Sequence, residues 1–300
     1  MTRPLVMLMS VLLAALPSCA TNDGSAADAA ASKQATSPHV VLTNREGNVR
    51  LTFPASEAGP LQLHAFGEQL MGASGPRQGS HSELWIDGKA AYGWTAVAFQ
   101  IAAPVAGHEW QYTVVTVPAT NVPGLKSFQR RFLCIEPDLV LILDEVSLTE
   151  PALLETGYWF PPSLAHDAVR DEWTVQTPRA GVTARFLSSP KSKQTKGDAT
   201  EGQVAGPVTN TVPSYVRSTV AEKVREFYQV TVLVVHPEQS RRSLAFKLLE
   251  SDTAIGVRVH RDGLPTLAAF RKTSCAGEAN LTGMKFNGPA AVDVFRPKQK

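Results

Sequence analysis

The sequence predicts an all-β protein, a large antiparallel β-sandwich of the supersandwich type. Short segments rich in β-branched and aromatic residues follow one another along the chain, each bounded by Gly, Pro, Asn or Asp. No stretch keeps a helical period of apolar residues beyond about two turns. Gly and Pro, at 21 each, supply the many turns that short strands need. Strands at this density without helical crossovers favour antiparallel sheets packed face to face.

The predicted strands begin near Val40 and continue almost to the C-terminus. In chain order they are 49–53, 61–66, 95–101, 110–117, 126–135, 139–145, 153–160, 173–177, 181–187, 225–235, 241–249, 254–259, 264–270, 284–286 and 291–295. The dipeptides Asp87-Gly88 and Asp262-Gly263 are typical of hairpin turns. Residues 188–212 are rich in Ser, Lys, Thr and Gly and predict a long surface loop. We expect one sandwich domain over residues 40–300.

The first residues, 1–18, predict an export signal rather than part of the fold. A short positive start at Arg3 precedes an apolar run, 5–16, that is shorter than the roughly 20 residues needed to span a bilayer. The segment Leu16-Pro17-Ser18-Cys19 resembles the lipobox of bacterial lipoproteins, so we expect lipid attachment at Cys19. The alternative is an ordinary signal peptide with a chance cysteine.

Residues 19–39 predict a flexible tether, because they are rich in Ala, Ser, Thr and Asp without an apolar period. Ala20 stands where an Asp would indicate inner-membrane retention. The expected location is therefore the periplasmic face of the outer membrane, with the lipid as the membrane contact. In this oxidising compartment Cys134 and Cys275 are able to pair. The apolar surroundings of Cys134 favour the alternative, two separate thiols.

Charge and motif content exclude several classes of function. Lys and Arg number 29 against 27 Asp and Glu, and the net charge of +2 is too small for the basic face that nucleic-acid binding requires. Residues 72–75 (GASG) lack the spacing of a serine-hydrolase elbow, and the sequence has neither a P-loop nor a dinucleotide fingerprint. His108, His236 and His260 are scattered without the spacing of metal ligands.

Four segments, in their order and spacing, resemble motifs of the heparinase II/III-like polysaccharide lyases. Residues 80–89 (SHSELWIDGK) resemble the H-N-x-x-x-I-D-G hairpin of that family, 128–146 its R-x-x-x-F-x-x-P-x-x-L-V-x-x-D hairpin, 158–161 its F-H-x-P strand end and 228–237 its T-V-L-x-P strand. The resemblance covers residues 50–250. It implies the C-terminal β-sandwich of the family, without the large α/α toroid that precedes the sandwich in complete enzymes.

The resemblance also implies a reaction, the β-elimination of uronate-containing polysaccharides. A base removes the C5 proton, a positive group neutralises the carboxylate, and an acid protonates the leaving oxygen. In the family most of these groups come from the toroid, for which 300 residues leave no room. We therefore expect an envelope lipoprotein that binds, or assists the processing of, an acidic polysaccharide without autonomous catalysis. The alternatives are a lyase acting alone or with a separate helical toroid subunit, and a periplasmic scaffold that has lost the site.

The metal site of the family is matched at one position. Alignment on the glycines of the motif places His81 at a ligand position, but it places Ala55 and Ala73 where the family has His and Asp. Zinc takes three or four nitrogen, oxygen or sulfur ligands, so we expect no cofactor. His64 lies on a strand facing this region and is a possible substitute ligand, so zinc binding remains the alternative.

The candidate catalytic residues are His81 and Tyr215, with Tyr215 offering a phenol for proton transfer beside Arg217. Aromatic rings next to a cation suit an anionic sugar chain. On this ground the candidates for substrate binding are Trp85, Lys89, Tyr92, Trp94 and Trp159, and Arg131 is added as a possible contact for a glycan carboxylate.

Each candidate also has a structural interpretation. His81 is able to form a hydrogen bond within its own hairpin turn. Tryptophans on sandwich strands commonly belong to the core. Arg131 and Asp144 are expected to form a pair that joins two strands. Tyr158, Trp159 and His166 predict a second aromatic edge.

Overall fold

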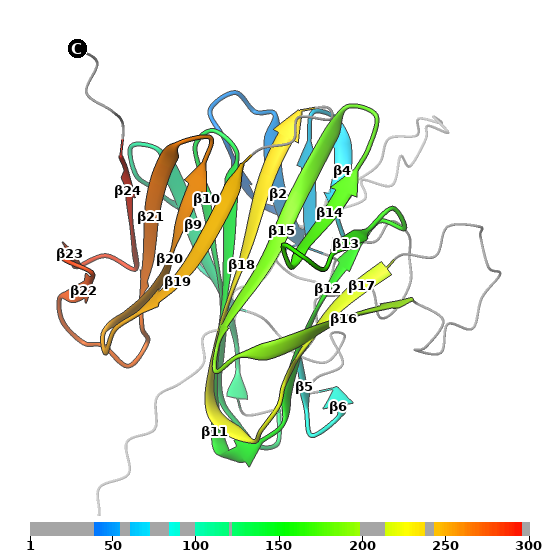
Figure 1. The fold of residues 1–300 in the computed structure, drawn as a ribbon. Helices are drawn as coiled ribbons and strands as arrows, with labels where there is room; N and C mark the ends of the chain where they lie inside the picture. Colours follow the sequence, from blue (N-terminus) through cyan, green and yellow to red (C-terminus); the bar gives the residue numbers. More distant parts are fainter. Residues whose placement is uncertain are drawn as a thin grey trace, which may run out of the picture. The chain divides into compact units, whose positions relative to one another are not determined.

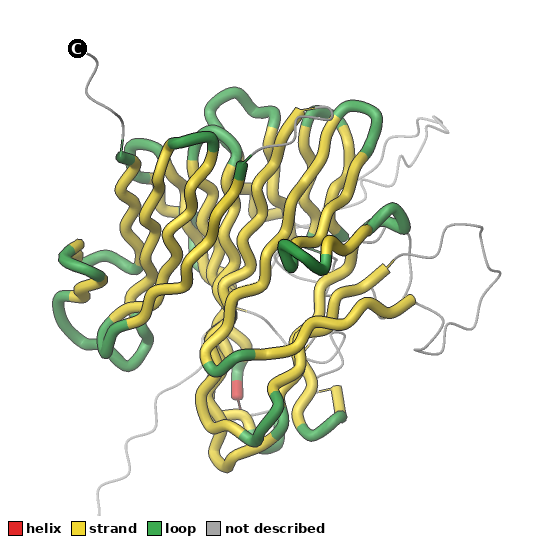
Figure 2. The backbone as a smooth tube through the Cα atoms, viewed as in Figure 1, coloured by secondary structure: helices red, strands yellow, loops and turns green. Residues whose placement is uncertain are grey.

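The structure, a computed structural model, describes residues 39–54, 61–72, 84–90, 100–119, 122–198, 214–237 and 243–295. These residues form antiparallel strands joined by turns within one compact unit, so the predicted all-β sandwich is confirmed (Figure 2). Within them no helix is long and apolar enough to cross a membrane. The predictions for the signal, Cys19, His81, Tyr92 and Trp94 fall outside the described residues.

The central sheet has nine strands. They are β7 (Gln100–Ile101), β8 (Val105–Ala106), β9 (Trp110–Val117), β10 (Leu125–Ile135), β11 (Leu139–Ala152), β13 (Ala165–Asp167), β14 (Glu172–Gln176), β15 (Ala180–Ser189) and β18 (Val224–Pro237). The order is β13-β14-β15-β18-β11-β10-β9-β7, with β8 also paired to β9 (Figure 1). In β11, Val140 and Ile142 join the core on one face, whereas Leu141 and Leu143 join the core on the other. A continuous apolar run is what a strand buried on both faces requires.

Two sheets cover the first face of the central sheet. The N-terminal sheet consists of β1 (His39–Thr43), β2 (Val49–Pro54), β3 (Gln62–Ala65) and β4 (Glu68–Met71). The β12 sheet consists, in spatial order, of β16 (Ser192–Asp198), β17 (Ser214–Val220), β12 (Leu154–Phe160), β5 (Leu84–Ile86) and β6 (Lys89–Ala90). One apolar core joins all three sheets, with Leu63, Ile142 and Phe160 among its fully buried members. This core fixes the inner face of the β12 sheet and leaves the opposite face outward.

The C-terminal sheet covers the second face of the central sheet. It consists of β19 (Leu244–Glu250), β20 (Ala254–Arg261), β21 (Leu264–Arg271) and β24 (Ala290–Val294), and a small hairpin of β22 (Ala279–Leu281) and β23 (Met284–Phe286) packs beside it. Leu141 and Val232 of the central sheet share a core with Val257 and Phe270 of this sheet. β19 is its edge strand on the side of β15 (Figure 1).

A buried ion pair links the central sheet to the β12 sheet. Arg130 donates two hydrogen bonds to Asp144, at 2.6 and 2.9 Å, and the Tyr158 hydroxyl donates a third at 2.6 Å. Asp144 and Tyr158 have no exposed surface. Burial raises the pKa of Tyr158 well above its ordinary value, so the phenol stays protonated and remains a donor.

A second ion pair lies on the opposite face. Arg131 contacts Glu145 at 2.5 Å, and Glu145 accepts the backbone N–H of Thr273 at 2.9 Å, just beyond β21. The predicted pairing of Arg131 with Asp144 is therefore wrong. Arg130 stands directly opposite Asp144 in the β10–β11 register, and consecutive residues of a strand point to opposite faces.

The predicted loop at 188–212 is corrected in its first part. β15 extends to Ser189, and residues 192–198 form β16, which pairs along its whole length with β17. β16 is the edge of its sheet, and its polar side chains are exposed or partly exposed, so the strand carries no apolar signal. Residues 199–213 lie outside the described residues.

The two predicted hairpin turns are confirmed. Asp87-Gly88 and Asp262-Gly263 are two-residue loops in which both residues of each pair have positive φ. This is the left-handed conformation that favours Asp-Gly. The alternative of separate thiols is also confirmed, because Cys134 and Cys275 are both free.

Candidate functional site

The outward face of the β12 sheet gathers three of the predicted site residues. Along β12, Leu154, Tyr158 and Phe160 are buried on the inner side, whereas Glu155 and Trp159 are partly exposed on the other side. β17 alternates in the same way and turns Tyr215 and Arg217 outward. Trp85 of β5 stands opposite Glu155 in the register and therefore shares this face.

These side chains form a continuous row across three strands. The guanidinium carbon of Arg217 lies 4.6 Å from the ring centroid of Trp85 and 5.3 Å from that of Tyr215. The rings of Tyr215 and Trp159 meet edge to face, with centroids 5.3 Å apart and an interplanar angle of 60°. We call the row Trp85, Arg217, Tyr215 and Trp159 the aromatic face. A cation between two aromatic rings, on the outside of a rigid sheet, is its central feature.

Two glycines make this arrangement possible. Gly157 stands opposite Arg217, and a Cβ atom there would lie 2.9 Å from the indole of Trp85. The indole therefore extends over the glycine toward β17, where it meets the guanidinium. Gly197 of β16 stands opposite Tyr215, and a Cβ atom there would lie 2.1 Å from the ring. Both rings thus rest on strand backbone that carries no side chain.

Glu155 holds the guanidinium of Arg217 in place on the aromatic face. Its Oε2 atom lies 3.4 Å from Nη1 of Arg217 and accepts a hydrogen bond from the Thr219 hydroxyl at 3.3 Å. The Nε atom of Arg217 is buried without a hydrogen-bond partner, whereas 34% of the side chain is exposed. Arg217 is therefore oriented by Glu155 and still presents part of its guanidinium to the outside.

The cation between the aromatic rings is Arg217, whereas the sequence predicts Lys89 in this place and gives Arg217 as a neighbour of Tyr215. In the hairpin Lys89 pairs with Ile86, and Trp85 pairs with Ala90, so Lys89 emerges on the other side from the indole. The signal for Arg217 was the alternation S-Y-V-R-S-T-V in residues 214–220, which reads as a half-buried strand.

Among the described residues, the other predicted ones do not join the aromatic face. Arg131 lies in the buried pair described above, on the far side of the central sheet. The predicted second aromatic edge of Tyr158, Trp159 and His166 is wrong, since Tyr158 points into the core beside Asp144. The ring of His166 instead stacks on Trp173, with centroids 4.1 Å apart.

The described residues do not supply a zinc ligand set. Among them no group of three or more His, Cys, Asp and Glu side chains is arranged to hold a metal ion. His64 contacts Gln62 through Nε2 at 3.2 Å, and burial together with the neighbouring Arg50 lowers its pKa. Ala55, Ala73 and His81 lie outside the described residues, so the expectation of no zinc stays a prediction.

The fold is similar to that of solved heparinase III-type lyases. One is heparan sulfate lyase HepC from Pedobacter heparinus, with a TM-score of 0.57, 13% identity, and a match covering 80% of this chain and 40% of that chain. Another is heparinase III, with a TM-score of 0.60, 12% identity, and coverage of 79% of this chain and 42% of that chain. A further heparinase III gene product has a TM-score of 0.61, 14% identity, and coverage of 79% of this chain and 41% of that chain. The chain thus spans about two fifths of the length of these lyases. At such identities the likeness shows the fold alone. No protein-family model and no curated protein matches the sequence.

Proposed function

We propose that this protein binds an acidic polysaccharide through the aromatic face and is not a catalyst by itself. The observation that carries the proposal is the guanidinium of Arg217 lying between the rings of Trp85 and Tyr215 on the outward side of a sheet. Support comes from the fold, which is shared with lyases whose names refer to heparan sulfate or heparin.

The chemistry of the row matches the two parts of an acidic sugar chain. The C–H faces of pyranose rings pack on aromatic surfaces, and Trp85 and Trp159 provide such surfaces at the two ends of the row. A carboxylate or sulfate between them would meet Arg217, whose planar donors suit both anions. Because Glu155 and the two rings already hold the guanidinium, little side-chain entropy remains to be lost on binding.

Binding without catalysis is favoured by the groups that the face provides. β-Elimination needs a base, a group that neutralises the carboxylate, and an acid, all within reach of one sugar. In the described part of the face, Arg217 suits the second role and Tyr215 is the one candidate for proton transfer. Glu155 already pairs with Arg217.

The second candidate function is a lyase of the β-elimination type, acting alone or with a separate helical subunit. The specific observation in its favour is the proximity of Tyr215 to Arg217, which puts a phenol next to a carboxylate-neutralising cation. His81 remains a predicted partner for this chemistry. Under this alternative, unsaturated uronate product would accumulate when the purified protein is incubated with heparan sulfate or alginate.

We further propose that the protein acts at the periplasmic face of the bacterial outer membrane. Lipid attached at Cys19 would be its anchor, and residues 19–39 would be the tether that gives the sandwich reach toward a glycan. Labelling with a radioactive fatty acid tests this: label on the wild type and none on Cys19→Ser is expected. Label that persists on the variant contradicts the anchor.

The test of the proposed function compares acidic with neutral chains. Titration calorimetry with heparan sulfate and alginate oligosaccharides should show binding that weakens as salt is raised, whereas neutral dextran should not bind. Ultraviolet absorbance of the same mixtures reports unsaturated product. Equal affinity for dextran would overturn the acidic ligand class, and sustained product formation would establish the lyase alternative instead.

A further inference from the structure

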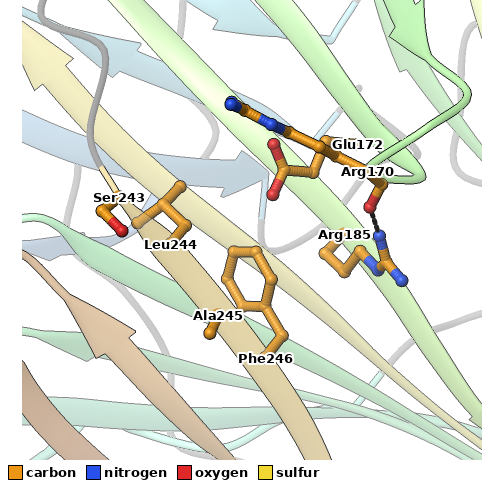
Figure 3. Close-up of a pocket in the computed structure, with 7 residues that line it drawn as sticks. All are labelled: Arg170, Glu172, Arg185, Ser243, Leu244, Ala245 and Phe246. Atoms are coloured by element: carbon orange, nitrogen blue, oxygen red, sulfur yellow. Dashed lines mark hydrogen bonds between the residues drawn. The ribbon is translucent and has the colours of Figure 1, made fainter.

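An open pocket lies beside the edge of the C-terminal sheet, apart from the aromatic face. Its volume is ≈540 Å³, within the roughly 300–1,000 Å³ typical of small-molecule sites. It forms because the C-terminal sheet ends at β19, above β15, while the central sheet continues to β14 and β13. Its lining residues are Arg170, Glu172, Arg185, Ser243, Leu244, Ala245 and Phe246 (Figure 3).

Glu172 is the unusual group of this pocket. It is 9% exposed, and among the described residues its carboxyl has no hydrogen bond or ion pair. Figure 3 shows the carboxyl pointing toward the side chains of Leu244 and Phe246 across the pocket. Burial raises its pKa, while Arg170 and Arg185 act in the opposite direction. The Glu172 carboxyl lines this open pocket, so a bound ligand that donates hydrogen bonds would satisfy oxygens that no described protein group satisfies.

Arg185 fixes the wall of the pocket that faces β19, which is the same wall that carries Glu172. Its Nη1 atom donates to the backbone carbonyls of Arg170 and Asp171, and Nη2 lies 3.2 Å from the Asp171 carboxylate. The carboxylate of Asp167 accepts the backbone N–H groups of Val169 and Arg170 at 3.0 and 3.1 Å. The turn between β13 and β14 is thus fixed by side-chain bonds, and the pocket exists before a ligand arrives.

Arg170 and β19 supply the remaining features. The Arg170 side chain is 62% exposed, and Figure 3 shows its guanidinium extending along the rim past Glu172. Leu244 and Phe246 of β19 give the pocket a partly buried apolar wall. A ligand that contacts Arg170, Glu172 and Phe246 together needs an anionic group for Arg170, hydroxyls for Glu172 and an apolar face for Phe246.

We propose that this pocket binds a single acidic sugar unit. Its carboxylate or sulfate contacts Arg170, its hydroxyls donate to the Glu172 carboxylate, and its C–H face packs on Phe246. This inference rests on the proposed function, because the sugar unit would be the end or a side branch of the acidic polysaccharide that the protein binds. It adds a second site, built from residues that the aromatic face does not use.

Ligand-observed NMR titration of the purified protein with glucuronic acid, and with glucose as the neutral counterpart, tests the inference. Arg170→Ala should weaken glucuronic acid binding about tenfold and change glucose binding little. Glu172→Ala should weaken both about tenfold, whereas Glu172→Gln, which keeps an acceptor oxygen and removes the negative charge, should preserve glucuronic acid binding. Lys247→Ala removes an exposed charge from the same strand and is the matched control.

The outcomes separate this inference from the proposed function. No glucuronic acid binding, or binding that Arg170→Ala and Glu172→Ala leave unchanged, overturns the pocket even if long acidic chains still bind. Loss of glucuronic acid binding in Lys247→Ala to the same extent also overturns it, because charge alone would then explain the effect. Glucuronic acid binding that depends on Arg170, in a protein that binds no long acidic chain, supports the pocket and refutes the proposed function.

Discussion

Replacing Arg130 by Met should destabilise the protein strongly, although Arg130 is buried on the inner side of the β12 sheet and is not part of the aromatic face. Arg130 is 5% exposed, and its partner Asp144 is fully buried between the central sheet and the β12 sheet. Met fills a similar volume but donates no hydrogen bond, so Asp144 would lose both guanidinium bonds and its buried counter-charge.

The magnitude follows from the burial of the pair. Removing one partner of a buried ion pair costs about 3–5 kcal/mol, out of the ~5–15 kcal/mol that a folded domain has in total. Removing both charged side chains together with the Tyr158 hydroxyl is different, because no unpaired charge remains. Arg130→Met combined with Asp144→Leu and Tyr158→Phe should therefore recover most of the loss.

Urea unfolding followed by tryptophan fluorescence measures these free energies. Arg225→Ala, which removes an exposed partner of Glu150 at 3.0 Å, is the control and should cost at most about 1 kcal/mol. If Arg130→Met costs no more than this control, or if the triple variant is less stable than Arg130→Met, the reasoning about the buried pair is refuted.

Three further predictions concern single sites. Gly197→Ala should weaken the binding of acidic oligosaccharides in calorimetry, because the new Cβ atom would lie 2.1 Å from the ring of Tyr215. Gly277→Ala, which has open space around it, is the control and should leave binding unchanged. Equal effects of the two substitutions would contradict the prediction. His64 takes up a proton near pH 6.5 in the unfolded chain and at lower pH in the folded chain, because its pKa is lowered on folding. The free energy of unfolding should therefore fall as the pH drops through this window, and it should fall less in His64→Gln than in the wild type. The native protein should react with a thiol reagent at Cys275 but not at Cys134, whose pKa burial raises to about 12; labelling of Cys134 at the same rate would show that it is accessible.

The sequence predicts much of the fold because the strand signals are local. The run LVLIL at the start of β11 is apolar on both sides, which a strand between two layers needs, and the Asp-Gly dipeptides mark their turns. β16 (SKQTKGD) escaped prediction because an edge strand with polar side chains on both sides carries no apolar period. Its pairing with β17 comes from backbone hydrogen bonds, which a sequence pattern does not record.

The candidate site was predictable in its residue types but not in its arrangement. Trp85, Trp159 and Tyr215 were all candidates, yet they come from three strands that are separate along the chain. Their meeting depends on register: Trp159 stands opposite Tyr215, and Gly157 stands opposite Arg217. The same limit explains the error at Asp144, since a shift of one residue changes which face a side chain occupies.

The central claim is that Arg217, held between two rings, recognises the anionic group of a polysaccharide. Its most direct test is the affinity for heparan sulfate oligosaccharides of the wild type, Arg217→Ala and Arg225→Ala, measured by calorimetry in one buffer. Both variants lose one positive charge, but Arg225 pairs with Glu150 away from the aromatic rings. We predict about a tenfold or greater loss for Arg217→Ala and near wild-type affinity for Arg225→Ala. Equal affinities for the two variants would contradict the account.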